Sequence, residues 1–308
     1  MTNRRGTWIK LAHVSRSVAV TMHPSRPEAL EAAARFVTGM HKHNITCLID
    51  ALGLELLAPH VPAGSLKDIV EARDVELDVV FGGDGNILRA AEWAVPREVP
   101  VLGVNLGHVG FLAELESSEV GELIRRVVDK DYHVEERETI EIRVRNGSAL
   151  WESFAVNEVS IEKLARERML EVLVRVDGKA LSRWATDGVL VSTPTGSTAY
   201  AFSAHGPVVW PDVQALLLVP LSAHALFARP LVISPDSVVE IEIVDGAPDG
   251  VVWCDGRRSF EITQGMAIKV TRGTHKLHLA RTGEQPFVTR LVRKFELPVA
   301  GWRGGRKC

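Results

Sequence analysis

The sequence has few cysteines, and the three it has lie far apart. Cys47, Cys254 and Cys308 are spread over 308 residues. This spacing supports neither a disulfide framework nor a zinc cluster. We therefore expect a chain that folds without disulfides, with no set of metal-ligating side chains of its own, and a cytoplasmic location.

The sequence also lacks a long apolar run and a strong charge of either sign. No stretch approaches the roughly 20 apolar residues that a membrane-spanning helix needs. The N-terminus carries Arg4, Arg5 and Lys10 but no apolar core of the kind found in signal peptides. A formal net charge of −3 gives no overall basic field for nucleic acid or an anionic membrane. We expect neither nucleic acid nor a membrane as a partner.

Several common catalytic motifs are missing. There is no G-x-x-x-x-G-K-[ST] loop, no metalloprotease helix and no G-x-S-x-G elbow. The glycines at 82, 83 and 85 do not fit G-x-G-x-x-G, because Leu88 occupies the third glycine position. The common phosphate loop and the common dinucleotide fingerprint are therefore excluded.

What the sequence does contain is enough apolar material for a large core, at 46% of the residues, in about two domains. In the first part, strand-like and helix-like stretches alternate. We expect strands at 17–22, 45–49 and 75–81 and after Pro100, and helices at 27–43, 66–72, 87–93 and 118–129. This alternation predicts an α/β domain with a parallel, Rossmann-like sheet whose ligands bind at the carboxyl ends of the strands.

The pattern changes near Tyr132. From there to about residue 279 the runs are short and strand-like, and turn signals separate them. They predict a β-rich, sandwich-like domain. Beyond Pro286, Phe287, Leu291 and Phe295 are spaced for one face of a helix that packs against the rest. We expect an α/β domain at 1–131, a β-rich domain at 132–281, and a C-terminal helix and tail at 282–308 that pack back on the first domain.

The stretch around Asp84 is the most informative. A buried strand leads into G-G-D-G-N at 82–86, and a short helix follows. Glycines let the backbone approach a ligand, and a helix start offers N–H groups to an anion, so the loop suits a phosphate. A carboxylate among phosphates is repelled unless it binds a metal, contacts a hydroxyl or takes a proton. The alternative is that Asp84 and Gly85 form an ordinary tight turn.

Two further stretches could contact a ligand. In Thr186 to Pro207, a strand leads into small hydroxyl residues at 195–198, which suit sugar and phosphate oxygens but would equally cap a helix. In the 154–161 stretch, Glu158 shares a strand face with apolar residues, which makes it a partly buried acid. A ribose diol or an arginine would satisfy it. For Asn157 and Glu158 to contact one ligand, the strand must end or bulge there.

Taken together, these stretches resemble NAD kinases. The family's order is matched by G-G-D-G-N at 82–86, V-N-L-G-H-V-G-F-L at 104–112, Asn157-Glu158, T-D-G at 186–188, S-T-P-T-G-S-T-A-Y at 192–200 and the C-D-G turn at 254–256. The ending R-L-V-R-K-F-x-L-P-V-x-G-W resembles the actinobacterial branch. G-G-D-G alone also occurs in phosphofructokinases and in diacylglycerol or sphingosine kinases, whereas the long loop at 192–200 favours NAD kinase.

The resemblance implies ATP-dependent phosphorylation of the adenosine ribose 2′-hydroxyl of NAD, giving NADP, with Asp84 as the proton acceptor and Mg²⁺ arriving with ATP. Inorganic polyphosphate stays open as a donor. The resemblance also implies a homodimer or homotetramer assembled through the β-rich domain. Two alternatives remain: a kinase that acts on a lipid or another sugar, and a nucleotide sensor without activity.

The resemblance also assigns binding positions. Gly82, Gly83 and Asn86 would form the phosphate cradle, and Arg89 would contact phosphate. The remaining NAD-binding positions would be Gly85, Phe111, Asn157, Glu158, Arg168, Ala185, Asp187, Thr195, Thr198, Ala199, Tyr200, Ala201, Phe202, Ser203 and Arg257. Three residues depart from the family pattern. Ala185 stands where some members have arginine, Arg257 replaces a common glutamine, and His205 interrupts S-A-G-G-P, where a positive φ would strain it.

Overall fold

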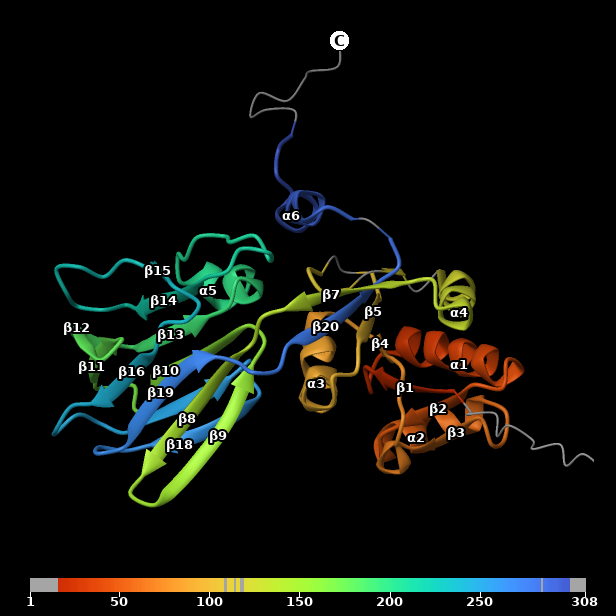
Figure 1. Cartoon of the computed structure of the whole chain (residues 1–308), viewed down its shortest axis with the longest axis horizontal. Helices are drawn as coiled ribbons and strands as arrows, with labels where there is room; N and C mark the ends of the chain where they lie inside the picture. The colour runs from red at the N-terminus through yellow and green to blue at the C-terminus, as the bar shows by residue number, and fades with distance from the viewer. Residues whose placement is uncertain (1–15, 108–109, 114, 117–118, 284, 300–308) are drawn as a thin grey trace, which may run out of the picture.

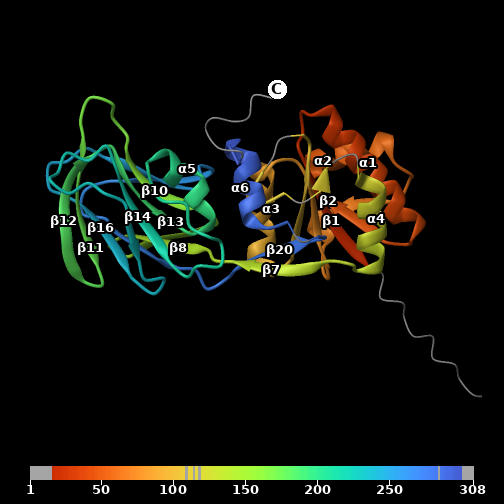
Figure 2. The same ribbon diagram turned by 90° about the horizontal axis from the view of Figure 1, so that it is seen from above.

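The computed structural model describes residues 16–107, 110–113, 115–116, 119–283 and 285–299. Two lobes lie side by side, one with helices around a sheet and one built of β-strands, and the helix α6 (Phe287–Phe295) lies between them (Figures 1 and 2). Within the described residues, every helix is too short or too polar to cross a bilayer.

The sheet of the first lobe takes strands from both ends of the chain. Five parallel strands lie in the order β3-β2-β1-β4-β5. β6 and β20 pair parallel with β5, and β7 pairs antiparallel with β20. The bounds are β1 (Ser17–Met22), β2 (Thr46–Ile49), β3 (Leu66–Asp68), β4 (Asp78–Phe81), β5 (Val101–Asn105), β6 (Leu115–Glu116), β7 (His133–Arg137) and β20 (Leu277–Arg281). The parallel sheet expected from the sequence is confirmed.

Helices cover both faces of this sheet. Alternate strand residues face opposite sides, so Phe81 packs with the face covered by α1 (Pro27–Lys42) and α4 (Val120–Asp129), whereas Val80 packs under α3 (Asp84–Ala94). A shorter helix, α2 (Ala51–Leu57), and single 3-10 turns at Ala58–His60, Ile69–Glu71 and Val95–Arg97 complete the described helical segments of the lobe.

One predicted helix is wrong. The stretch 66–72 forms β3 and then a single 3-10 turn at Ile69–Glu71. Leu66 is paired with Cys47 of β2, so the backbone hydrogen bonds of this stretch go to the sheet edge. A helix weakly favoured by local pattern loses to this pairing, because tertiary context overrides propensity.

The strand order predicts where a ligand binds. Chain connections run outward in opposite directions from β1 and β4, so the carboxyl ends of these neighbouring strands form a switch point. In open α/β sheets the ligand crevice lies at such a point. Met22 and Phe81, the last residues of β1 and β4, mark it here.

The second lobe is a β-sandwich. Two six-stranded antiparallel sheets, β15-β14-β13-β10-β17-β18 and β12-β11-β16-β19-β8-β9, form over the described residues. Their facing side chains share one core that includes Trp184, Ile142 and Val159. The bounds are β8 (Ile140–Asn146), β9 (Ala149–Ala155), β10 (Glu158–Lys163), β11 (Leu170–Val176), β12 (Lys179–Thr186), β13 (Gly188–Ser192), β14 (Leu216–Leu221), β15 (Leu231–Ile233), β16 (Val239–Ile243), β17 (Gly250–Cys254), β18 (Arg258–Ile262) and β19 (Ala267–Arg272).

The connection between the lobes runs through β7 and β20. Both strands belong to the α/β sheet, although they flank the β-rich region in sequence. The division at residues 131 and 281 stays a proposal. The aromatic stripe of α6 packs as expected, since Phe287 and Phe295 each contact Phe111.

Candidate active site

The glycine loop lies at the carboxyl end of β4. Gly82 and Gly83 connect this strand to α3, which begins at Asp84, three residues before the predicted start. None of the three glycines at 82, 83 and 85 has a positive φ. Gly82 is needed for lack of space, because a Cβ there would lie 2.4 Å from the Asn86 side-chain nitrogen. A Cβ on Gly83 or Gly85 would meet nothing within 4 Å. The helix therefore starts beside open space, and because Asp84 and Gly85 lie in its first turn, the alternative of an ordinary tight turn is excluded.

The Asp84 carboxylate is held by a second loop. Its Oδ2 accepts a hydrogen bond from the Phe111 N–H at 2.9 Å, and its Oδ1 accepts one from the Leu112 N–H at 3.1 Å. A Cβ on Gly110 would lie 2.3 Å from Oδ1, so this position requires glycine. The carboxylate thus has one fixed orientation, which a proton acceptor needs.

Arg89 lies at the switch point between β1 and β4. One of its guanidinium nitrogens donates to the Met22 carbonyl at 2.6 Å. The buried Asp78 lies nearby: burial raises its pKa to about 7, and the charge of Arg89 opposes this rise. Arg89 has further donors for an anion, so the sequence-based phosphate contact stays a prediction.

A bend separates β9 from β10 and carries Asn157. The strand ends at Ala155 and restarts at Glu158, as a shared ligand contact for Asn157 and Glu158 requires. The carboxylate of Asp255 holds the bend by accepting the N–H of Val156 at 2.9 Å and of Asn157 at 2.7 Å. Buried polar backbone is satisfied in this way without a regular ladder.

Glu158 is the buried acid that the strand pattern predicts, with 8% of its surface exposed. It accepts a hydrogen bond from the backbone of Tyr200, while its Oε2 has no partner among the described residues. Burial, followed by the nearby Asp255 charge, raises the pKa of Glu158 to about 8. Near neutral pH this carboxyl is therefore mostly protonated and can donate a hydrogen bond.

The stretch 193–205, which follows β13 and carries the small hydroxyl residues (the hydroxyl loop), contacts this bend. Thr193 donates from its backbone to the Asn157 carbonyl at 2.9 Å, and a Cβ on Gly196 would lie 2.1 Å from that oxygen. The loop continues as a 3-10 helix at Thr195–Thr198 and the short α5 (Tyr200–Ser203). Close packing therefore sets the loop against Asn157.

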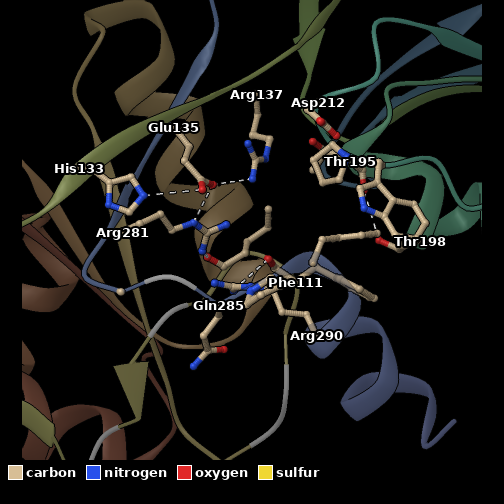
Figure 3. A pocket seen from close by; sticks show the side chains of 16 residues that line it. Phe111, His133, Glu135, Arg137, Thr195, Thr198, Asp212, Arg281, Gln285 and Arg290 are labelled. Carbon is tan, nitrogen blue, oxygen red and sulfur yellow. Dashed lines mark hydrogen bonds and ion pairs between the residues drawn. The ribbon is translucent and has the colours of Figure 1, made fainter. Parts of the chain in front are cut away.

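Four of the predicted NAD-binding residues of this loop line two cavities. Thr195 and Thr198 line a cavity of about 380 Å³ together with Phe111, and Figure 3 shows the two threonines across it from Glu135 and Arg281. Tyr200 and Ser203 line a second cavity of about 690 Å³. Both cavities therefore lie beside this loop.

The other predicted positions near this loop have different surroundings. Asp187 lines the second cavity and pairs with Lys163 at 2.5 Å. Ala201 is fully buried in an apolar cluster, and Phe202 packs on Phe295 of α6. Ala199 precedes α5 as its N-cap residue.

Arg168, Ala185 and Arg257 lie outside both cavity linings. Arg168 is exposed and donates to the Gly246 carbonyl at 2.9 Å. Ala185 accepts the backbone N–H of His224, and Arg257 pairs with Glu92 of α3 at 2.7 Å. Arg257 therefore links the sandwich to the helix that begins at Asp84.

His205 has a φ of 62°, so the strain expected at this departure from the family pattern is present. No group of three or more His, Cys, Asp or Glu side chains that could hold a metal ion occurs in the part of the chain that the structure describes.

Sequence reasoning missed four supporting residues. Gly110 makes room for Asp84, Asp255 holds the Asn157 bend, and Arg281 and Arg290 bind the loop that holds Asp84. Gly110, Asp255 and Arg290 each lie inside a motif that matches the family, at 104–112, 254–256 and 290–302, and this match is the signal that could have found them.

Comparison with known proteins covers both lobes. Residues 18–132 match the family model of the ATP-NAD kinase N-terminal domain, and residues 156–282 match that of the ATP-NAD kinase C-terminal domain. The chain is 54% identical over 296 residues to the NAD kinase of Cutibacterium acnes, a match that covers 95% of this chain and 93% of that protein.

Two solved structures share the fold. The yeast NADH kinase complexed with NADH has a TM-score of 0.83 at 23% identity, over 95% of this chain and 90% of that one. An NAD kinase from Archaeoglobus fulgidus in complex with ATP has a TM-score of 0.70 at 24% identity, over 92% and 100%. The two family models, together with the extended identity to a bacterial relative, lead to one conclusion: this chain belongs to the NAD kinase family.

Proposed function

We propose that this protein transfers a phosphoryl group from ATP to the adenosine ribose 2′-hydroxyl of NAD, giving NADP, with Asp84 as the general base. Membership in the NAD kinase family supports the reaction. The observation that carries the role of Asp84 is its fixed carboxylate beside the open glycine positions at the end of β4.

The proposed step is a proton transfer coupled to displacement. Asp84 takes the proton of the 2′-hydroxyl while the hydroxyl oxygen forms a bond to the terminal phosphorus of ATP. The bond from that phosphorus to the bridging oxygen breaks, and ADP leaves. A sugar hydroxyl is a poor nucleophile, and a positioned base contributes about 10²–10⁴ in rate. Gly83 and Gly85 leave the backbone at the start of α3 accessible to phosphate oxygens.

NAD would lie between the lobes, along the hydroxyl loop. Its ribose would meet Asn157 and Glu158, and the unsatisfied Oε2 of Glu158 supports this placement. Because the Glu158 carboxyl holds a proton near neutral pH, it would donate to a sugar oxygen as well as accept from one. Of the proposed contacts in this loop, Thr195 and Thr198 line one cavity and Tyr200 and Ser203 line the other.

Mg²⁺ would arrive with the donor. In phosphoryl-transfer sites this ion usually keeps several waters and is bound largely through substrate phosphates, so ATP itself would supply most of its ligands. The ion would neutralise charge on the transferred phosphoryl group.

We also propose a homodimer or homotetramer assembled through the β-rich lobe, in the cytoplasm. Leu226 and Phe227 are exposed in the loop before β15, and Val232 is exposed on β15 itself, which is an edge strand. Such an apolar edge favours pairing with another chain. Light scattering measures the assembly, and Phe227→Asp should reduce its size.

The proposed cytoplasmic location is supported by the cysteines. The buried thiols of Cys47 and Cys254, which form no disulfide, are consistent with a reducing compartment.

An initial-rate assay with purified protein tests the function. NAD is offered with ATP or with inorganic polyphosphate, and NADP formation is followed. We expect turnover that requires NAD and a donor. Phosphorylation of sphingosine or diacylglycerol in place of NAD would favour the lipid-kinase alternative, and NAD binding without any turnover would favour a sensor.

A further inference from the structure

The loop at 110–113 is bound on both sides of its backbone. Its N–H groups at Phe111 and Leu112 donate to Asp84. Its carbonyls accept from two arginines that come from distant parts of the chain. Arg281 of β20 donates to the Leu112 carbonyl at 2.9 Å, and Arg290 of α6 donates to the Ala113 carbonyl at 2.6 Å.

Arg290 is unusual because it is buried, whereas the other residues of the C-terminal helix α6 are exposed or partly buried. Only 5% of its surface is exposed, and it is the buried residue of α6. Its guanidinium also lies 3.3 Å from the Phe111 carbonyl. A buried charge is tolerated where it is well hydrogen-bonded, and these carbonyls supply the bonds.

Aromatic contacts fix α6 at this position. Phe287 and Phe295 contact Phe111 of the α/β lobe at ring-centroid distances of 5.7 and 5.9 Å. On the other side, Phe295 contacts Phe202 at 4.5 Å, and Phe287 contacts Trp210 at 5.1 Å. The helix therefore bridges both lobes at the cavity wall, where Figure 3 shows Arg290 beside Phe111.

We propose that Arg290 is a positioning residue for the reaction: it fixes the carbonyls of Phe111 and Ala113, and the amides of the same loop fix the Asp84 carboxylate. The R-L-V-R-K-F helix thereby contributes to the active site through the loop at 110–113. This inference rests on the proposed role of Asp84. A misplacement of about 1 Å at a reacting group can cost about 10²-fold in rate, so loss of Arg290 should act on kcat.

Two variants and one control test the proposal. Arg290→Met removes the donors and keeps an apolar stem of similar length, while Arg290→Lys keeps a charge and three donors. Arg293→Met is the matched control, because Arg293 is exposed on the same helix. We expect Arg290→Met to lower kcat by about 10- to 100-fold with a smaller change in KM for NAD, and Arg290→Lys to recover part of this loss. Arg293→Met should behave like the wild type.

A double-mutant cycle with Asp84→Asn separates positioning from mere stabilisation. If Arg290 acts through Asp84, Arg290→Met should change the residual rate of the Asp84→Asn protein by less than about threefold, because residues that act as a unit are not additive. Hydrogen exchange of the peptide that contains 110–113 should also be faster in Arg290→Met. An equal fractional loss of kcat in both backgrounds, or an unchanged kcat in folded Arg290→Met, would overturn the proposal. A wild-type protein that forms no NADP would instead overturn the proposed function.

Discussion

The Asp84 carboxylate accepts the backbone N–H of Phe111 at 2.9 Å, across 27 residues of sequence. This bond joins the first residue of α3, which follows β4, to the loop that follows the neighbouring parallel strand β5. The orientation of the proposed base therefore depends on a loop that contributes backbone groups to it. Changes in that loop should alter catalysis without touching a substrate.

Gly110→Ala tests this dependence. The added Cβ would lie 2.3 Å from the Asp84 Oδ1, so the carboxylate must shift. We expect kcat for NADP formation to fall by about 10- to 100-fold, because catalysis is sensitive to displacements of about 1 Å. Gly121→Ala is the control, since a Cβ there meets nothing within 4 Å. A Gly110→Ala protein with wild-type kcat would mean that the Asp84 orientation is not set by this loop.

Gly85→Ala tests whether phosphate approaches the backbone at the start of α3. A Cβ at this first-turn position of α3 meets no protein atom within 4 Å, and alanine in a helix stabilises by about 0.5–1 kcal/mol relative to glycine. We expect a protein that is at least as stable as the wild type but has a higher KM for ATP, because the methyl group would occupy space used by phosphate. Thermal melting and initial rates measure the two effects. An unchanged KM would place the phosphates elsewhere.

The pH dependence of stability tests the buried state of Glu158. Its pKa rises from 4.5 to about 8, chiefly through burial and then through the Asp255 charge. Between these values the unfolded chain releases a proton that the folded chain keeps, so the contribution of this group to the free energy of unfolding falls as the pH rises. Glu158→Gln cannot titrate. We expect the melting temperature of Glu158→Gln, relative to that of the wild type, to increase as the pH rises from about 5 to about 8.

Glu167→Gln provides the control for that comparison, because Glu167 is exposed in the loop before β11. Its melting temperature should follow the wild-type profile. Parallel profiles for Glu158→Gln and the wild type would show that Glu158 does not keep its proton in the folded protein.

His205→Gly tests backbone strain in the hydroxyl loop. His205 has a φ of 62°, a conformation that costs an L-residue about 1 kcal/mol or more and costs glycine little. We expect His205→Gly to raise the free energy of unfolding by about 0.5–1 kcal/mol, as measured by denaturant titration. His205→Ala keeps the strained backbone and should bring no such gain. Equal stabilities of the two variants would argue against the strain.

Local patterns predicted much of this fold. The strand and helix alternation at 17–105 gave the parallel sheet, since period 2 and period 3.6 are distinct in such runs. The pattern around Glu158 indicated both its burial and the strand break beside it, and both are present. The helix expected at 66–72 failed because pairing with β2 decided its structure.

The supporting contacts of the site could not be predicted in the same way. Asp255 bonds to Asn157 across 98 residues, and Arg290 bonds to Ala113 across 177 residues. Neither pair shares a local period or motif, and the fold alone brings them together. The sequence also did not predict that α3 starts at Asp84, because Gly85 in its first turn has a low helix propensity.

The rate of NADP formation by Asp84→Asn is the most direct test of the account. Asparagine is close to aspartate in shape but cannot accept a proton from the 2′-hydroxyl. With NAD binding measured in parallel by calorimetry, we expect nearly unchanged affinity and a kcat lower by about two to four orders of magnitude. A kcat equal to that of the wild type would contradict the assignment of Asp84 as the base.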